Sequence, residues 1–456
     1  MNSRFDVIII GAGPGGAAAA RLLAQGGKKV ALVEDAHLGG VCVNLGCIPT
    51  KFLLAAAAPI GELRDQARFG SLTGGISVDF AALQKRKDRF VKGTSQSLSK
   101  ALSGLGVSIF MGRGQAVAPG TVAVGGEIPV TLESGDIILA TGSRPASFPG
   151  MMPDGEAVLD SSMLLALDEI PESLLVVGAG AIGMEFSDFF SAVGSRVTVI
   201  EGMPQLIPTE DADIAEELRK ITEKSGRTCI TGRKAVSLVT RDGQAELTFE
   251  DGKTLAASKA LVAVGRSPNT CGLGVENLGG SLTPRGFVKV DESLRAAPGC
   301  YAIGDVNGKT LLAHAAEHQA EYVARRILGG TDKPYLSGPV PSCVFGHTEV
   351  MRVGMTAGEA LAAGSSVDLS IAPMSLNPIA QAHGFSAGFA KAVWADGELV
   401  GMAAVGYGVS RLVTAAQLLV LGRHTPETLH GFMFCHPTLD EILKSALMAQ
   451  KTKFSA

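Results

Sequence analysis

The pair Cys42 and Cys47 is the first feature of the sequence that could carry redox chemistry. Both cysteines lie in the segment GGVCVNLGCIPTK, residues 39–51. In a regular helix, residues five apart have Cα atoms roughly 8–9 Å apart, whereas a disulfide requires less than about 7 Å. A bridge between them therefore demands a distorted turn, which Gly46 and Pro49 permit. Such a bridge would be readily reduced, although the spacing alone also fits two unpaired core cysteines.

A glycine-rich turn before the cysteines has the spacing of a dinucleotide-binding fingerprint. Residues 5–10, FDVIII, predict a buried strand, and the segment GAGPGG that follows opens a predicted helix. Gly11 would make the tight turn, Gly13 would let the backbone approach a pyrophosphate, and Gly16 would allow close helix–strand packing. The next predicted strand ends at Glu34, a candidate partner for a ribose hydroxyl.

The same plan returns in the middle of the chain. A predicted strand, residues 174–177, is followed by Gly178, Gly180 and Gly183, a predicted helix, and a strand that ends at Glu201. Each acid follows the third glycine of its motif by 18 positions. A single glycine motif also fits a turn that serves packing alone, but two matching copies predict two bound dinucleotides. The usual pairing is FAD with a nicotinamide nucleotide.

The residues after Glu201 bear on the choice between NAD and NADP. Residues 202–206, GMPQL, contain no Arg or Lys that could meet a 2′-phosphate. This favours NAD. The alternative is a basic residue supplied from elsewhere in the chain, for which Arg266 is an example.

Composition narrows the class of protein. The 456 residues are 46% hydrophobic and 18% charged, with a formal net charge of -4. This excludes a disordered polar chain and gives no polycationic surface for nucleic acid or an anionic membrane. No uncharged apolar run reaches about 18 residues, so we expect no bilayer span. Seven cysteines are too few for a disulfide scaffold in a chain of this length, and an odd number leaves at least one thiol unpaired. We therefore expect a reducing, cytoplasmic location.

Taken together, the motifs resemble the FAD-dependent pyridine nucleotide–disulfide oxidoreductases, and within that family the dihydrolipoamide dehydrogenases, nearly end to end. The segments that carry the resemblance are the first fingerprint, GGVCVNLGCIPTK (39–51), ATGSRP (140–145), the second fingerprint with Glu185, VGRSPN (264–269), AIGD (302–305), LAH (312–314) and HPTLDE (436–441). They occur in the family order, and such a set is highly specific.

The resemblance implies an α/β fold with two Rossmann-like dinucleotide-binding domains, one for FAD and one for NAD, and a C-terminal α+β dimerisation domain. It assigns residues 1–150 and 270–335 to the FAD-binding domain, 151–269 to the NAD-binding domain and 336–456 to the dimerisation or interface domain.

The resemblance also assigns roles to single residues. Cys47 would be the thiol nearer the flavin and Cys42 the interchange thiol that meets the substrate. Lys51 would lie near the flavin N5 and pair with Glu185. Asp305 would hydrogen-bond the ribityl chain. Further positions near the cofactors, by the same resemblance, are Thr141, Gly142, Gly265 and His314.

His436 is implied as the acid–base residue, supplied across a dimer interface and oriented by Glu441. Imidazole suits thiol–disulfide exchange because a proton must be accepted and returned near neutral pH. A chain that completes its partner's site in this way would be an obligate homodimer. We expect no metal site, since the remaining histidines show no metal-ligand spacing.

The activity implied is oxidation of dihydrolipoamide to lipoamide with NAD⁺, the lipoyl group being free or carried on a protein. One alternative is NAD(P)H-dependent reduction of another disulfide or of mercuric ion. The tail, residues 446–456, lacks the cysteine pair usual in mercuric reductases. Another alternative is a flavoprotein subunit that acts mainly as a binding component of a multienzyme complex.

Three residues depart from the pattern of the dihydrolipoamide dehydrogenases. Met351 and Arg352 replace small residues, and Arg411 replaces an acid. All three fall in the predicted interface domain. They leave the flavin and dithiol chemistry in place, but they put the identity of the substrate in doubt.

Overall fold

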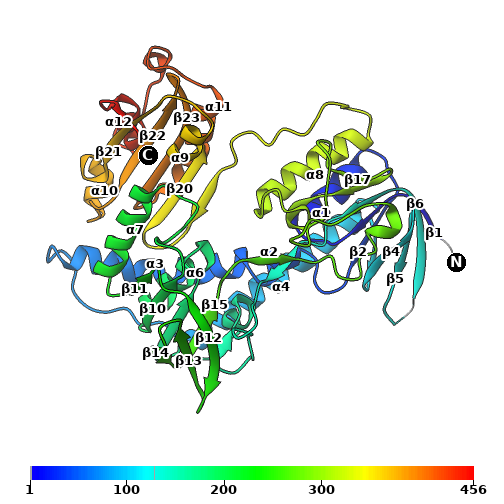
Figure 1. Cartoon of the computed structure of the whole chain (residues 1–456), viewed down its shortest axis with the longest axis horizontal. Helices are drawn as coiled ribbons and strands as arrows, with labels where there is room; N and C mark the ends of the chain where they lie inside the picture. The colour runs from blue at the N-terminus through cyan, green and yellow to red at the C-terminus, as the bar shows by residue number, and fades with distance from the viewer. Residues whose placement is uncertain (1–2, 128, 456) are drawn as a thin grey trace. The chain divides into compact units, whose positions relative to one another are not determined.

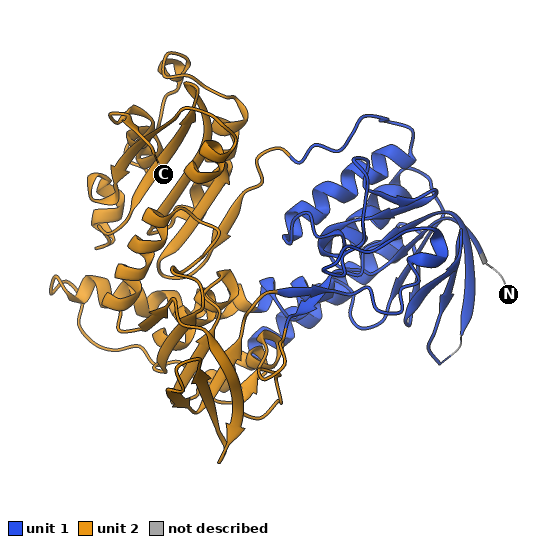
Figure 2. Cartoon of the chain, in the orientation of Figure 1, with its two compact units in different colours: residues 1–49, 85–146, 266–337 blue, residues 50–84, 147–265, 338–456 orange. Residues whose placement is uncertain are grey.

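The structure, a computed structural model, describes residues 3–127 and 129–455 (Figure 1). The chain folds into two compact units, which Figure 2 distinguishes by colour. Unit 1 comprises Met1–Pro49, Lys85–Ala146 and Arg266–Ser337, and unit 2 comprises Thr50–Gln84, Ser147–Gly265 and Gly338–Ala456. This division into two units leaves the three predicted domain boundaries as predictions.

Unit 1 is built on an eight-stranded sheet with the order β17-β18-β6-β1-β2-β3, to which β5 adds beside β6 and β4 beside β5. β7 and β16 form a separate antiparallel pair. The strands are β1 (Ser3–Ile10), β2 (Val30–Glu34), β3 (Ser108–Met111), β4 (Gly114–Ala118), β5 (Thr121–Val124), β6 (Val130–Leu139), β7 (Ser143–Pro145), β16 (Arg266–Pro268), β17 (Arg295–Ala297) and β18 (Cys300–Ala302). The helices are α1 (Pro14–Gln25), α2 (Gly40–Asn44), α8 (Ala313–Ile327), and the short 3-10 turns η1 (Glu276–Leu278) and η2 (Gly304–Asn307).

The first fingerprint forms the predicted strand, turn and helix. β1 pairs in parallel with both β2 and β6 and is therefore a central strand. Its β-branched residues are buried, as is typical of a parallel sheet covered on both faces. α1 begins at Pro14, directly after Gly13, and proline suits the first helical position because its missing N–H has no intrahelical partner there. α1 then packs on α8, where a Cβ at Gly15 would lie 3.2 Å from Ala316.

Unit 2 contains a second sheet, with the order β11-β10-β9-β15-β8. Unlike the mixed sheet of unit 1, it is parallel throughout. An antiparallel sheet, β12-β13-β14, accompanies it. The strands are β8 (Val158–Leu159), β9 (Ser173–Val177), β10 (Arg196–Glu201), β11 (Thr228–Thr231), β12 (Ala235–Arg241), β13 (Gln244–Phe249), β14 (Thr254–Ala257) and β15 (Lys259–Val262), with helices α5 (Ser161–Leu165), α6 (Ala181–Ala192) and α7 (Ala212–Lys224). The succession β9–α6–β10 repeats β1–α1–β2.

The C-terminal part of unit 2 is an antiparallel sheet with the order β19-β20-β23-β22-β21-β24. Its strands are β19 (Ser342–Val344), β20 (Glu349–Gly354), β21 (Val367–Pro373), β22 (Phe389–Ala395), β23 (Glu398–Gly406) and β24 (Thr452–Lys453). Its helices are α9 (Ala357–Ala362), α10 (Pro378–Ala382), α11 (Val413–Leu421) and α12 (Glu441–Met448), with 3-10 turns η3 (Met374–Leu376), η4 (Val409–Leu412) and η5 (Thr428–Gly431). Two sheets, each with a parallel strand–helix–strand unit at its glycine turn, and a C-terminal α+β region confirm the predicted fold class.

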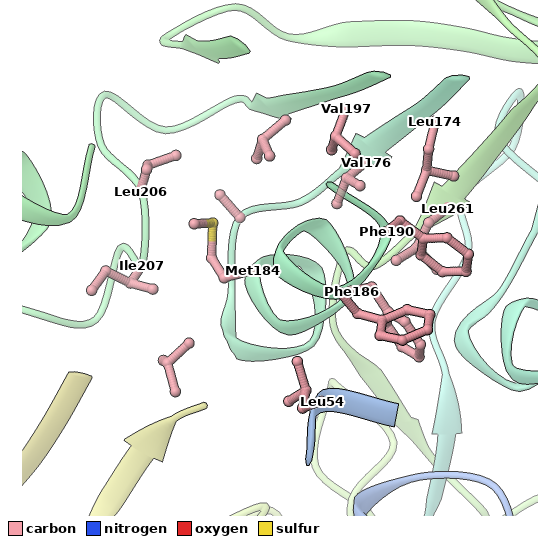
Figure 3. Close-up of a cluster of buried hydrophobic side chains, with 14 of the residues drawn as sticks. Leu54, Leu174, Val176, Met184, Phe186, Phe190, Val197, Leu206, Ile207 and Leu261 are labelled. Atoms are coloured by element: carbon pink, nitrogen blue, oxygen red, sulfur yellow. The ribbon is translucent and has the colours of Figure 1, made fainter. Parts of the chain in front are cut away.

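The core of unit 2 gathers around α6. Phe186, Phe190 and Met184 of this helix are buried, and they share one apolar cluster with Val176 of β9 and Leu54 (Figure 3). Leu54 belongs to α3 (Cys47–Ala67), which, like α4 (Phe80–Gly104), begins in one unit and ends in the other. Packing of α3 on α6 therefore fixes where the polar side chains of these two helices meet.

The stretch Gly40–Ala67 is long and apolar enough to span a membrane by length and composition, with a mean hydropathy of 1.6 and 28% of the window buried. The sequence has no uncharged apolar run of this length, but this stretch includes charged residues such as Lys51. Leu53, Leu54 and Ala57 of this stretch belong to the core of unit 2, and its Lys51 forms an ion pair with Glu185. Core helices of this kind meet the same criteria as membrane spans, so the stretch is weak support for a membrane span.

Candidate active site

The first glycine of each fingerprint occupies a backbone position that other residues rarely adopt. Gly11 has φ +102° and Gly178 has φ +103°. A Cβ at Gly11 would lie 2.3 Å from the carbonyl oxygen of Ala140, and one at Gly178 would lie 2.4 Å from that of Ala263. Both turns therefore require glycine, for the same reason and with nearly the same geometry.

The second and third glycines of each fingerprint have different roles, the second in binding and the third in packing. A Cβ at Gly16 would lie 1.9 Å from the carbonyl oxygen of Gly11, and Gly183 has the same relation to Gly178, so these glycines allow helix and strand to approach. Gly13 and Gly180 have no heavy atom within 4 Å of an added Cβ. Nothing in the protein requires glycine there, so the bare backbone facing open space fits the approach of a bound dinucleotide.

The two acids are held in the same way. The carboxylate of Glu34 accepts hydrogen bonds from the backbone N–H groups of Ala12 and Ala36, at 2.8 and 2.9 Å. Glu201 accepts from Ala179 and Met203, also at 2.8 and 2.9 Å. Each carboxylate is thus fixed against its own glycine turn and retains acceptor capacity for a ribose hydroxyl. Both sites fit a dinucleotide.

The guanidinium of Arg266, the example of a basic residue that could meet a 2′-phosphate, is engaged by other residues of unit 1. Its guanidinium donates to the Ser143 hydroxyl at 2.6 Å and to the Ser143 carbonyl at 2.8 Å, and it lies 3.5 Å from Asp305. The Ser143 hydroxyl in turn donates to Asp305. Asp305 is therefore held at a defined position in η2, where the resemblance predicts a contact with FAD.

Thr141 and Gly142 lie beside this network in unit 1, after β6. The Thr141 hydroxyl donates to the carbonyl of Asn269 at 2.8 Å, and the Gly142 carbonyl accepts from the Asn269 N–H at 3.0 Å. His314 lies in the first turn of α8. Gly265, with φ +118°, follows β15 in unit 2. The cofactor roles predicted for these residues remain predictions.

The helix is interrupted between the two cysteines, as a bridge between them would require. α2 ends at Asn44, Leu45 leaves the helical region, and α3 begins at Cys47. A Cβ at Gly46 would lie 3.1 Å from the carbonyl oxygen of Val41, which keeps this turn tight. Cys42 is half-buried and Cys47 is exposed. Cys47 lies at the N-terminus of α3, where the helix dipole favours negative charge.

Lys51, one turn into α3, is paired with Glu185 of α6. The ammonium lies 2.8 and 2.7 Å from the two carboxylate oxygens, and 4.4 Å from the centroid of the Phe345 ring. The Phe345 N–H donates to Glu185 at 3.3 Å. Burial raises the pKa of Glu185, and the charge of Lys51 opposes that rise. The pair therefore holds the lysine at a fixed position along α3.

His436 and Glu441 form a second pair in unit 2. The Nδ1 atom of His436 lies 3.1 Å from both carboxylate oxygens of Glu441, the first residue of α12. The backbone N–H of Thr438 donates to the same carboxylate, and this bond, with the contact from His436, lowers the pKa of Glu441. The His436 side chain is 74% exposed, so its second ring nitrogen can meet a ligand or another chain. Cys42 and Cys47 belong to unit 1.

Two of the three departures from the family pattern have partners inside unit 2. Met351 is fully buried in the core of the C-terminal sheet. Arg352 donates to Glu210 at 2.9 Å and to the carbonyl of Gly354 at 3.0 Å. These two residues serve packing and an ion pair. Arg411 is exposed on η4, with its guanidinium 5.8 Å from the centroid of the Tyr407 ring.

Sequence reasoning missed two residues with notable positions. His347 is 2.6 Å from Asp65 in a half-buried contact that joins the β19–β20 loop to α3. Arg233 follows β11 and donates its backbone N–H to the carbonyl of Glu201 at 3.4 Å. The position of Arg233 could have been predicted, because Arg233 follows the strand beside β10 and the carboxyl ends of neighbouring parallel strands share one edge of a sheet. Within residues 3–127 and 129–455, no cluster of three or more acidic, His or Cys side chains is arranged to hold a metal.

Comparisons with known proteins agree with this geometry. The family described as "Pyridine nucleotide-disulphide oxidoreductase" matches residues 5–320, and the dimerisation domain of that family matches residues 340–447. A relative from Chlorobaculum tepidum, named dihydrolipoyl dehydrogenase, is 37% identical over 98% of this chain and 97% of its own length. One of the same name from Bacillus subtilis is 34% identical over 99% of both chains.

Solved structures are similar over the same extent. The crystal structure of LpdA from Mycobacterium tuberculosis has a TM-score of 0.89 at 28% identity, covering 98% of this chain and 99% of its own. The HOCl-induced flavoprotein disulfide reductase RclA from Escherichia coli, solved as a Cu(II) complex, has a TM-score of 0.87 at 27% identity, with the same coverage.

Proposed function

Because the chain belongs to the pyridine nucleotide–disulphide oxidoreductase family, we propose that it oxidises dihydrolipoamide to lipoamide with NAD⁺. The observation that carries the proposal is the conjunction, in one chain, of two glycine turns closed by equally anchored acids and a cysteine pair at a helix break. Full-length similarity to relatives named dihydrolipoyl dehydrogenase supports the choice of substrate.

The two turns provide for the two cofactors. Gly11, Gly13, Gly16 and Glu34 would hold FAD, and Asp305 would add a contact to it. The corresponding residues for NAD are Gly178, Gly180, Gly183 and Glu201. Bound FAD supplies the two-electron chemistry that connects a dithiol to a nicotinamide.

The protein side of the reaction is thiol–disulfide exchange. One thiol of dihydrolipoamide gives its proton to His436 of the partner subunit and attacks Cys42 of the oxidised pair, which releases the sulfur of Cys47. The second substrate thiol then attacks the substrate sulfur of this mixed disulfide and displaces Cys42. The two substrate protons, one of them returned by His436, end on Cys42 and Cys47. Lipoamide leaves with a new S–S bond, and two protein thiols remain, so the electron pair lost by the substrate resides in the dithiol.

The exposed His436 is consistent with a shared site. A side chain that is 74% exposed and held only from its Nδ1 side by Glu441 presents Nε2 outward. The family's dimerisation domain covers this region, so we infer a homodimer in which each chain supplies His436 to its partner. The proposed cytoplasmic location rests only on the sparse, odd number of cysteines.

A second candidate is NAD(P)H-dependent reduction of a different disulfide. The similar protein RclA is named a flavoprotein disulfide reductase. Reduction of mercuric ion is a third candidate, which the same assays test.

A substrate panel distinguishes the candidates. The FAD-loaded protein is assayed with dihydrolipoamide and NAD⁺, and then with NADH and lipoamide, glutathione disulfide or mercuric ion. Selective turnover of the lipoyl pair in both directions supports the proposal. Turnover of another disulfide, with none of lipoamide, would support the second candidate, and Arg411→Glu would then test whether the family's acid restores lipoyl turnover.

A further inference from the structure

A basic residue lies directly beside the acid of the second fingerprint. β10 and β11 are neighbouring parallel strands, and the loop after β11 returns toward the end of β10. The Gly232 N–H donates to the carbonyl of Met203 at 2.8 Å, and the Arg233 N–H donates to the carbonyl of Glu201 at 3.4 Å. These two bonds anchor Arg233 at the edge of the sheet where Glu201 would receive a ribose.

The side chain of Arg233 is engaged elsewhere. Its NH2 group donates to both carboxylate oxygens of Asp251, at 2.8 and 2.7 Å. Its guanidinium carbon lies 3.9 Å from the centroid of the Phe249 ring, and Phe249 itself is buried. The Arg233 and Asp251 side chains are 35% and 48% exposed. An ion pair this exposed to water is worth up to about 1 kcal/mol, or about fivefold in an equilibrium constant. A bound 2′-phosphate would have to break this pair to reach the guanidinium, and removal of Asp251 would remove that cost.

This arrangement matters for the choice of nucleotide. An acid at the end of the second strand selects the 2′-hydroxyl of NAD, whereas an arginine nearby accommodates the 2′-phosphate of NADP. Both residue types are present at this edge. Glu201 favours NAD, and Arg233 would oppose that preference unless its donors were occupied.

We propose that Asp251 is a specificity-determining residue, which holds Arg233 on Phe249 and so withholds a basic side chain from a 2′-phosphate at the nicotinamide-nucleotide site. This inference rests on the proposed function, since it requires that the second fingerprint binds a nicotinamide nucleotide. It attributes the preference for NAD to two acids, Glu201 at the ribose and Asp251 behind the arginine.

Four variants of the FAD-loaded protein test the proposal: Asp251→Ala, Arg233→Ala, the double variant, and Glu250→Ala. Glu250 precedes Asp251, carries the same charge and pairs with Lys234 at 3.2 Å, so its removal controls for the loss of a negative charge. Affinities for NAD⁺ and NADP⁺ are measured by calorimetry without a dithiol substrate, which makes the readout independent of turnover.

We expect Asp251→Ala to raise the affinity for NADP⁺ relative to NAD⁺ by up to about fivefold, because the phosphate no longer has to break an exposed ion pair to reach Arg233. The double variant and Glu250→Ala should keep the wild-type ratio. An unchanged ratio in Asp251→Ala, or an equal shift in Glu250→Ala or in the double variant, overturns the inference alone. If the wild-type protein binds neither nucleotide, the proposed function fails together with it.

Discussion

The ammonium of Lys51 and the carboxylate of Glu185 meet at 2.7 Å, joining residues that are 134 positions apart in the sequence. Glu185 is almost fully buried, whereas the Lys51 side chain is 36% exposed. The pair therefore fixes α3, the helix that begins at Cys47, at its Lys51 against α6 of the second fingerprint. Lys51 and Glu185, both predicted to belong to the site, therefore hold each other in position.

Removing the acid of this pair should destabilise the protein. We expect Glu185→Leu to lower the free energy of unfolding by about 1–3 kcal/mol, because Lys51 and the Phe345 N–H lose their acceptor while the lysine keeps some access to water. Urea unfolding measures the change. A matched control is Glu172→Leu, which breaks a 2.8 Å pair with Arg196 whose side chains are 78% and 76% exposed. It should change stability by less than about 1 kcal/mol. Equal losses in both variants would contradict this account.

Two glycines of the second fingerprint should respond differently to the same substitution. Gly180→Ala adds a Cβ to open space, so the fold should tolerate it while affinity for NADH falls, because the backbone no longer reaches the pyrophosphate. Gly183→Ala places a Cβ 1.9 Å from the carbonyl of Gly178 and should destabilise the protein. Thermal unfolding and NADH binding, measured on both variants, separate the two effects. Unchanged NADH affinity in Gly180→Ala would contradict the binding role.

The fingerprints could be predicted from sequence because their geometry is local. The turns at Gly11 and Gly178, and the acids Glu34 and Glu201, are determined by strand, turn and helix within about 25 residues. A distorted turn between Cys42 and Cys47 was expected if the two form a bridge, and the structure has a helix break there. In contrast, the engagement of Arg266 by Ser143 and of Arg352 by Glu210 depends on segments more than 100 positions apart. No local sequence pattern predicts such contacts. The sequence alone therefore could not show that Arg352, which raised doubt about the substrate, forms an ion pair with Glu210.

The orientation of His436 should depend on Glu441. The N–H of Thr438 and the contact with His436 lower the pKa of Glu441, so its carboxylate is charged at neutral pH. The contribution of this charge is present above the ordinary carboxyl pKa and is lost only as the pH falls through the lowered value. We expect Glu441→Gln to reduce turnover with dihydrolipoamide roughly 100-fold, with little change in unfolding or in dimer content.

Steady-state kinetics of Glu441→Gln, alongside His436→Gln, provide the measurement. His430→Ala is the control, since His430 is exposed on η5 and has no proposed role. Turnover by His436→Gln at the wild-type rate would show that another group moves the proton.

Three of the remaining thiols, those of Cys229, Cys300 and Cys343, should be poor nucleophiles. Burial raises the pKa of Cys229 to about 11 and those of Cys300 and Cys343 to about 12. After reduction with NADH, iodoacetamide at about pH 8 should therefore label Cys42 and Cys47 before these three, as peptide mass spectrometry would show. Faster labelling of Cys300 or Cys343 would contradict the burial seen in the structure.

The same thiols give stability a pH dependence. Between the ordinary thiol pKa of 9.0 and about 12, the folded state holds a proton on Cys300 that the unfolded state releases. Stability therefore falls as the pH rises through this range, by up to about 1.4 kcal/mol per unit. Cys300→Ala should show a shallower alkaline loss in unfolding experiments than the wild-type protein. An identical slope would exclude this source.

The central claim is tested most directly by NADH formation from NAD⁺ and free dihydrolipoamide, with the FAD-loaded wild-type protein and its Cys47→Ser variant side by side. The account predicts turnover in the range of about 1–10³ s⁻¹ for the wild type, lost in the variant although the variant still binds FAD and NADH. Equal turnover in both, or none in a wild-type protein whose flavin NADH reduces, would contradict it.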